Sequence, residues 1–269
     1  MPTFHHDRLN FNYVDMGEGQ PFIFQHGLGG DLNVPVSLFK PQPGVRFIAL
    51  DCRGHGETRP LGDVEKLNFN QFADDVLALV DHLHLPPVVI GGVSMGAGLS
   101  LNFALRYPER VRGLVFSRPA WLDSPMPSNL RWLALAGTFI QEFGSQPGLE
   151  RFKQTPEYAA LLAESSDAAA TLVGQFLHPR ADETAAKLVR LSNDAPSRDR
   201  STWAAIRVPT LVLVNQADPV HPVEFGQTLA EAIPGAELKE LTSKAISNER
   251  YIEDTQDVLG EFMQQFIGR

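Results

Sequence analysis

The stretch Val88-Val89-Ile90-Gly91-Gly92-Val93-Ser94-Met95-Gly96-Ala97-Gly98-Leu99 decides the fold of this chain. It begins with a short apolar, β-branched run, and the residues from Leu99 to Leu105 have a helical character. The glycines between these two parts let the backbone turn sharply and pack closely against its neighbours. The stretch therefore predicts a buried strand, a tight turn at Ser94 and a helix.

Strands and amphipathic helices alternate on both sides of this unit. Apolar stripes at helical spacing run from Phe72 to Leu83 and from Ile252 to Phe266. Strands are predicted at residues 11–16, 21–25, 45–50, 88–92, 113–116, 210–214 and 237–241. Most are continuous apolar runs, which are typical of a parallel sheet covered on both faces. The alternation predicts an α/β fold with a mostly parallel, doubly wound sheet.

The alternation is interrupted once, between Trp121 and about Thr202. This segment contains helical patterns and prolines but no predicted strand, so we expect a helical insertion above one edge of the sheet. The predicted division is a core of residues 1–120 and 202–269 and an inserted helical region of residues 121–201. Most apolar residues of the insertion are expected to form its own core.

Composition excludes several classes of function. The 269 residues carry 23 basic and 32 acidic side chains, a net charge of −9, so nucleic acid and anionic membrane surfaces are not expected partners. The single cysteine, Cys52, excludes an internal disulfide and an all-cysteine metal site. The uncharged stretch 85–105 is broken by prolines and glycines, which argues against a membrane span. No secretory signal is visible, so a cytoplasmic location is expected by default.

Ser94 is the candidate nucleophile. It is the serine of the G-x-S-x-G pattern Gly92-Val93-Ser94-Met95-Gly96, placed directly between the predicted strand and helix. A serine on such a turn exposes its hydroxyl above the sheet, and the Met95 amide at the start of the helix faces the same point. The alternative is a glycine-rich turn with an incidental serine.

A second loop supplies a candidate partner for this amide. The strand Phe22-Ile23-Phe24-Gln25 runs into His26-Gly27-Leu28-Gly29-Gly30, an H-G-x-x-G loop. The Leu28 amide of such a loop can complete an oxyanion hole with Met95. The next strand is followed by Asp51-Cys52-Arg53-Gly54-His55-Gly56, which we interpret as a structural polar turn.

The order of these motifs resembles the α/β-hydrolase superfamily over nearly the whole chain. It is most similar to small, lid-bearing bacterial esterases, lactonases and cofactor-free perhydrolases. The resemblance implies that residues 121–201 are a lid over the Ser94 face, with hinges near Pro119 and Ser201. Haloalkane dehalogenases and epoxide hydrolases share the fold that the resemblance implies, but they carry aspartate in place of the serine at this turn. Ser94 therefore argues against both.

The resemblance places the catalytic acid just after the strand that follows the lid. Asp218, in Asn215-Gln216-Ala217-Asp218-Pro219-Val220-His221, occupies that position. A carboxylate there would orient and stabilise an imidazole. The alternative acid position, after the strand ending at Phe116, reads Ser117-Arg118-Pro119 and holds no acid.

The catalytic histidine that the resemblance implies is missing from its usual position. It should lie in the loop Thr242–Tyr251, at Ile246 or Asn248 by the two ways of counting, and no histidine follows His221. His221, three residues after Asp218, and His178, in the insertion, remain as candidates. We expect His221 to be a loop histidine that faces solvent, because so short a loop permits but does not favour an inward orientation, and we expect no catalytic role for His178. Either His221 turns toward Ser94 or a weak substitute acts, such as a water held by Asn248 or Tyr251. We expect the second.

These features predict a serine-dependent hydrolase of a small carboxylic ester, thioester or lactone. Its activity is expected to be low because the usual base is missing. The expected partner is a small ester-like molecule, and no cofactor or metal is expected. The alternative is a non-hydrolytic protein of the same fold, a ligand-binding protein or a lyase-type enzyme, that retains the pocket.

Overall fold

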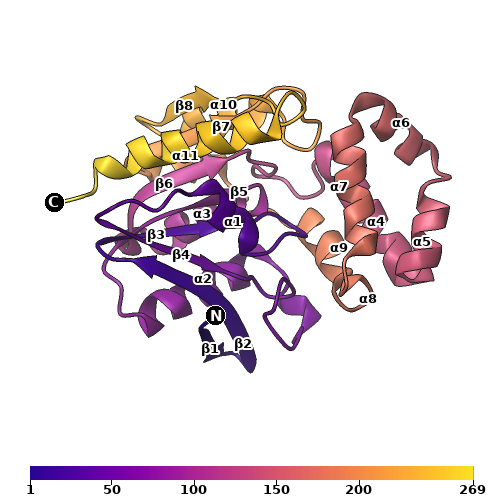
Figure 1. Ribbon diagram of the computed structural model, residues 1–269, viewed down its shortest axis with the longest axis horizontal. Helices are drawn as coiled ribbons and strands as arrows, with labels where there is room; N and C mark the ends of the chain where they lie inside the picture. Colours follow the sequence, from indigo (N-terminus) through magenta and orange to yellow (C-terminus); the bar gives the residue numbers. More distant parts are fainter. Residues whose placement is uncertain (269) are drawn as a thin grey trace.

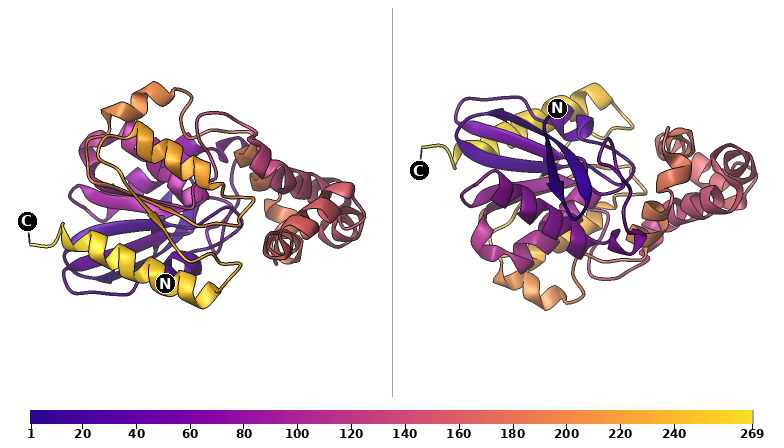
Figure 2. Two further views of the ribbon diagram at one scale, coloured as in Figure 1. Left: turned by 90° about the horizontal axis from the view of Figure 1, so that it is seen from above. Right: turned by 90° about the horizontal axis from the view of Figure 1, so that it is seen from below.

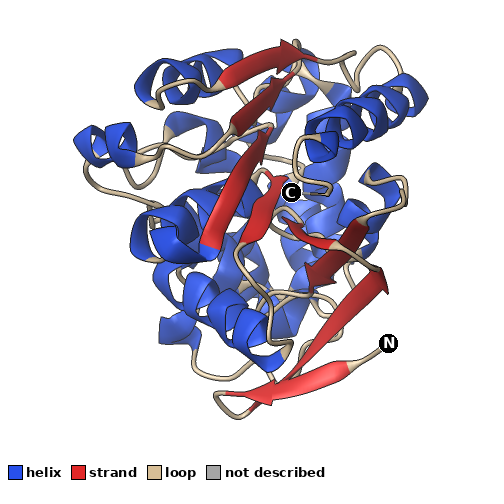
Figure 3. Ribbon diagram, turned by 90° about the vertical axis from the view of Figure 1, so that its left-hand side faces the viewer, coloured by secondary structure: helices blue, strands red, loops and turns tan. Residues whose placement is uncertain are grey.

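The computed structural model describes residues 1–268, and within them the strands form one eight-stranded sheet (Figure 3). The strands are β1 (Thr3–His6), β2 (Leu9–Gly17), β3 (Gln20–Gln25), β4 (Val45–Leu50), β5 (Val88–Val93), β6 (Val111–Ser117), β7 (Thr210–Val214) and β8 (Glu237–Glu240). They lie in the order β1-β2-β4-β3-β5-β6-β7-β8. The pairs β1–β2 and β2–β4 are antiparallel, and all later pairs are parallel.

Helices cover both faces of this sheet (Figure 2). The α-helices of the described chain are α1 (Asn33–Leu38), α2 (Phe69–His82), α3 (Met95–Arg106), α4 (Arg131–Phe143), α5 (Ser145–Phe152), α6 (Pro156–Glu164), α7 (Ser166–Leu177), α8 (Ala181–Thr184), α9 (Ala186–Ser192), α10 (Val223–Ala232) and α11 (Asn248–Gln264), of which α4 to α9 lie outside the layers that cover the sheet (Figure 1). Within the described part of the chain, none of them combines the length and apolar character needed to cross a membrane.

Side chains along each central strand alternate between two apolar layers. Phe22 and Phe24 of β3 belong to the layer beneath α11, whereas Ile23 belongs to the layer beneath α2 and α3. Because successive side chains of a strand point to opposite faces, a strand covered on both sides is buried at every position and is mostly apolar. β3 and β5 are buried in this way from end to end.

The predicted fold class is confirmed. The seven predicted strands correspond to β2 through β8, and the two helical stripes and the Leu99–Leu105 run correspond to α2, α11 and α3. Strand β1 and helices α1 and α10 were not predicted. Strand β1 has no apolar run that would predict it, and only Phe4 among its four residues is buried. It forms by antiparallel pairing with β2.

The segment between β6 and β7 is helical, as predicted. Helices α4 to α9 form a lobe to one side of the sheet (Figure 1). Phe152, Leu172 and Phe176 are almost fully buried within it, so its apolar residues largely pack against one another.

Two buried cations attach this helical lobe to the core. Arg180 donates hydrogen bonds to the carbonyl oxygens of Gly56 (2.6 Å) and Thr58 (3.1 Å). Lys187 of α9 donates to the carbonyl oxygen of Gly54 at 3.0 Å, and its side chain is almost fully buried. The lobe is therefore hydrogen-bonded to main-chain carbonyls of the loop after β4. These carbonyls carry no net charge, so they do not neutralise the charge of Lys187.

The turn between β5 and α3 is packed too tightly for side chains at its glycines. A Cβ atom at Gly96 would lie 2.5 Å from the carbonyl oxygen of Gln25, and one at Gly92 would lie 2.6 Å from the Cα of Gly96. The start of α3 is thus pressed against the end of β3. Ser94, between these glycines, has φ 57° and ψ −109°, a strained conformation for a residue with a side chain.

We expect Gly96→Ala to lower the free energy of unfolding by about 1–3 kcal/mol, because the new methyl group meets rigid backbone. The matched control is Gly174→Ala in α7, where a Cβ atom has no neighbour within 4 Å. That change should raise the free energy of unfolding by about 0.5–1 kcal/mol. Urea unfolding measures both, and equal effects of the two substitutions would contradict the packing described for the turn.

A second prediction concerns Lys187. Burial lowers its pKa from 10.5 to about 7. Between these values the unfolded state binds the additional proton, so the contribution of Lys187 to the free energy of unfolding rises with pH. From pH 7 to 10, the free energy of unfolding of the wild type should rise by up to about 4 kcal/mol relative to Lys187→Met. The control Lys40→Met alters an exposed lysine and should show no such pH-dependent difference. A constant difference between wild type and Lys187→Met would argue against a displaced lysine pKa.

Candidate active site

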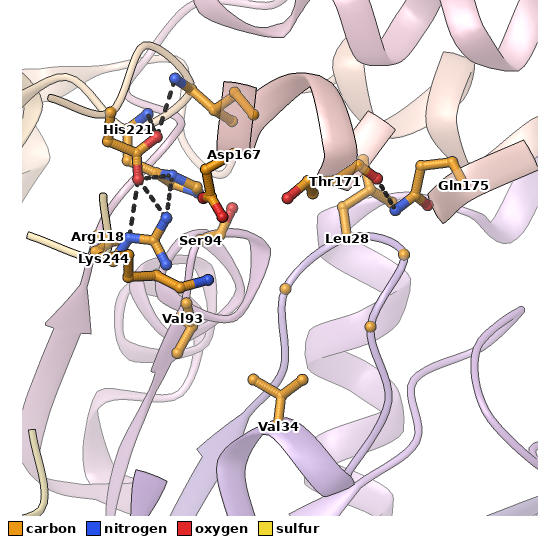
Figure 4. A pocket seen from close by; sticks show the side chains of 16 residues that line it. Leu28, Val34, Val93, Ser94, Arg118, Asp167, Thr171, Gln175, His221 and Lys244 are labelled. Carbon is orange, nitrogen blue, oxygen red and sulfur yellow. Dashed lines mark hydrogen bonds and ion pairs between the residues drawn. The ribbon is translucent and has the colours of Figure 1, made fainter. Parts of the chain in front are cut away.

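Ser94 is located at the start of α3 and lines a cavity of about 220 Å³ (Figure 4). Its amide donates to the carbonyl oxygen of Ser117 at 2.9 Å, which ties the turn to the end of β6. Within residues 1–268 the Ser94 hydroxyl has no hydrogen-bond partner, and the residue is largely buried. The hydroxyl is therefore free to act on a molecule in the cavity.

Two amides lie beside this hydroxyl without partners. The amides of Leu28 and Met95 donate to no protein atom in the described part of the chain. The Met95 amide is free because it is the first of the helix, where amides lack a partner within the helix. The Leu28 loop is close, since a Cβ atom at Gly27 would lie 3.3 Å from the Ser94 Cβ. The two predicted oxyanion-hole residues thus flank the predicted nucleophile.

His26 holds the Leu28 loop in place. Its Nδ1 donates to the carbonyl oxygen of Gly27 at 2.8 Å, and its Nε2 accepts from the Cys52 amide at 3.0 Å. Burial lowers the pKa of His26 and keeps it neutral. Because both ring nitrogens are engaged with backbone groups, His26 is not available as a base.

Asp218 and His221 contact each other in the loop after β7. The Nδ1 atom of His221 lies 2.9 Å from Oδ2 of Asp218, and Oδ1 of Asp218 accepts from the amides of Val220 (3.2 Å) and His221 (3.3 Å). The turn itself therefore positions both side chains. The Nε2 atom of His221 is buried and has no partner among the described residues, and His221 lines the same cavity as Ser94.

The expectation that His221 faces solvent is wrong. Its side chain is only 11% exposed. The short separation of His221 from Asp218 does not prevent an inward orientation, because the turn between them closes with backbone hydrogen bonds and directs the ring toward the carboxylate.

Arg118, at the end of β6, is a member of this group that the sequence analysis did not identify. Its Nε donates to Oδ2 of Asp218 at 3.1 Å, and its Nη2 also contacts that oxygen. The same Nη2 lies 3.0 Å from Nδ1 of His221. A signal was present: the position that could have held an alternative acid carries a cation, which can pair with the acid in the loop after the neighbouring strand.

These contacts shift the pKa values of both groups. Burial alone would raise the pKa of Asp218, but the charges and hydrogen bonds of His221 and Arg118 outweigh it and hold this pKa well below its usual value. Burial lowers the pKa of His221, the Arg118 charge lowers it further, and Asp218 offsets part of the shift. Asp218 is therefore ionised and His221 neutral at neutral pH.

The remaining walls of the cavity come from the helical lobe, from the loop after β8 and from apolar side chains of the core. Helix α7 contributes Asp167, Ala168, Thr171 and Gln175, and the loop after β8 contributes Lys244. Apolar side chains of Leu28, Val34, Val93 and Val220 complete the lining. The lobe therefore forms part of the cavity, next to Ser94.

The other residues considered for the base lie elsewhere. Ile246 is 80% exposed, Asn248 is exposed at the start of α11, and neither lines the Ser94 cavity. Tyr251 is buried, with its ring near the Arg118 guanidinium. His178 accepts a hydrogen bond from the Arg180 amide and is also absent from the cavity lining. Among the residues that the structure describes, no three His, Cys, Asp or Glu side chains gather as metal ligands would.

Comparison with known proteins finds similar sequences and similar folds. The 3-oxoadipate enol-lactonase 2 of Acinetobacter baylyi is 29% identical over 261 residues, which cover 92% of this chain and 93% of that protein. A thermophilic esterase from Thermogutta terrifontis has a similar structure, with a TM-score of 0.75 at 21% identity over 96% of this chain and 94% of that one. An enol-lactonase from Burkholderia xenovorans gives 0.73 at 22% identity, over 97% and 100% of the two chains.

The similarity to these solved structures shows the fold, and the match of the sequence to a protein-family profile shows the family. Residues 20–245, which include Ser94, Asp218 and His221, match the family described as alpha/beta hydrolase fold. This chain belongs to the alpha/beta hydrolase fold family.

Proposed function

We propose that this protein hydrolyses a small carboxylic ester, thioester or lactone through an acyl-enzyme on Ser94. The observation that carries the proposal is the strained turn that presents the Ser94 hydroxyl to a cavity beside two unpartnered amides. The similarity to an enol-lactonase over nearly the whole chain supports the same class of substrate.

In this proposal His221 is the general base and Asp218 orients it. The Ser94 oxygen attacks the substrate carbonyl carbon while its proton passes to Nε2 of His221. The Leu28 and Met95 amides stabilise the negative oxygen of the tetrahedral intermediate. His221 then gives the proton to the leaving group, and a water molecule, deprotonated by His221, releases the acid.

The position of His221 supports this assignment over a weak substitute. The sequence favoured a water held by Asn248 or Tyr251, but neither residue lines the cavity. His221 lines it and has its Nδ1 at 2.9 Å from a carboxylate, which is the contact that orients the base of a triad. Its Nε2 has no hydrogen-bond partner among the described residues and is free to accept the Ser94 proton. The expectation of low activity depended on a missing base. With His221 as the general base, there is no reason to expect low activity.

One contact favours the alternative, a non-hydrolytic protein. The Nη2 atom of Arg118 lies 3.0 Å from Nδ1 of His221. If Nδ1 accepted this hydrogen bond, Nε2 would carry the ring proton and could not receive one from Ser94. The helical lobe, residues 121–201, would act as a lid in either function, because α7 lines the cavity.

We expect Ser94→Ala to lose both labelling by a fluorophosphonate and turnover of 4-nitrophenyl butyrate, because the substitution removes the hydroxyl that the turn presents to the cavity. Its thermal unfolding should match the wild type. The control Ser37→Ala alters an exposed serine of α1 and should keep both activities. Labelling of Ser94→Ala at another residue, seen by mass spectrometry, would overturn the assignment of the nucleophile.

We expect His221→Asn to lower kcat/KM for 4-nitrophenyl butyrate by about 10²- to 10⁴-fold, through loss of the base. Asp218→Asn should also lower it, because it removes the carboxylate that stabilises the imidazole. The control His178→Asn changes a histidine outside the cavity and should keep wild-type kcat/KM. Wild-type turnover by His221→Asn would show that another group is the base.

A further inference from the structure

Three side chains meet at one oxygen of Asp218. Its Oδ2 accepts from Arg118 Nε at 3.1 Å, contacts Arg118 Nη2 and lies 2.9 Å from Nδ1 of His221. Arg118 and His221 also contact each other, with Arg118 Nη2 at 3.0 Å from His221 Nδ1. The three side chains are 9–11% exposed, so water screens these charges little.

This arrangement changes what the carboxylate does for the imidazole. In a serine triad the carboxylate stabilises the positive imidazolium that forms when histidine takes the serine proton. Here the guanidinium neutralises that carboxylate and also places a positive charge against the same ring. Because Coulomb energies are large between buried charges, the guanidinium opposes the protonation of His221.

We propose that Arg118 is a positioning residue that holds His221 in its neutral form and thereby sets the pH range over which the Ser94 site works. The inference rests on the proposed function only in treating His221 as the base. The effect of Arg118 on the ring follows from the contacts themselves, whatever the reaction.

The other charged groups around the cavity do not reverse this effect. Lys244, from the loop after β8, adds a second positive charge that disfavours protonation of His221. Asp167, at the start of α7, also lines the cavity, but its side chain is exposed, and it forms no ion pair in the described part of the chain. Tyr251 of α11 packs its ring at 5.4 Å from the Arg118 guanidinium carbon. Burial of the imidazole and the charges of its direct neighbours, Arg118 foremost, therefore together disfavour its protonation.

The first test is a titration of the ring nitrogens of the wild-type protein, labelled with ¹⁵N-histidine and followed by NMR. The signals of His221 are assigned by their loss in His221→Asn. The proposal expects them to titrate below the ordinary histidine pKa of 6.5. Titration at or above that value would overturn the proposal, and this result needs no variant of Arg118 to fold.

The second test is the pH profile of kcat/KM for 4-nitrophenyl butyrate. Arg118→Met keeps the aliphatic stem and removes the charge, so the acid limb should move to higher pH by about one unit or more. Arg118→Lys keeps a positive charge and should restore much of the wild-type profile. An unmoved acid limb in folded Arg118→Met, even with lower stability, would show that Arg118 is only a structural ion-pair partner.

The two proposals can fail separately. If Ser94 is not labelled and esters are not hydrolysed, but His221 titrates below 6.5 and Arg118→Met raises that value, the proposed function is wrong and the role of Arg118 stands. If esters are hydrolysed through Ser94 and His221 titrates ordinarily, the role of Arg118 is wrong and the proposed function stands.

Discussion

The close approach of β3, β5 and α3 at the Ser94 turn is the constraint on which the rest of the site depends. Gly92 and Gly96 have no room for side chains because the end of β3 lies against them. This packing holds Ser94 at a positive φ, so its hydroxyl faces the cavity and the first amides of α3 stay free. The strain is maintained by the surrounding sheet, whose central strands are buried on both faces.

The acid and the candidate base depend on a different kind of constraint. Asp218 and His221 belong to one turn, and backbone amides of that turn fix the carboxylate. Their relative geometry is therefore local and needs no contribution from the loop after β8. Arg118 reaches the same carboxylate from β6, which lies beside β7 in the sheet. The neighbouring strand thus determines how much of the Asp218 charge His221 experiences.

The helical lobe is held by polar contacts as well as by apolar packing. Arg180 and Lys187 bury their side chains and bond to main-chain carbonyls of the loop after β4. That loop is bonded in turn to the Leu28 loop, because His26 accepts a hydrogen bond from the Cys52 amide. The loop after β4 therefore binds both the helical lobe and the loop that carries the Leu28 amide of the candidate oxyanion hole.

The sequence by itself determined the fold class, the Ser94 turn and the helical insertion, because apolar runs, glycine spacing and helical stripes act over short stretches of chain. It also indicated Asp218, by motif order. Only the tertiary structure decided the surroundings of Asp218. The sequence favoured a solvent-facing His221, whereas the closed turn at Asp218 directs its ring toward the carboxylate. Arg118 lies 103 residues from His221 in the sequence, and no periodicity connects them. They meet because β6 and β7 are neighbours in a parallel sheet, whose strands bring the loops at their carboxyl ends to the same edge.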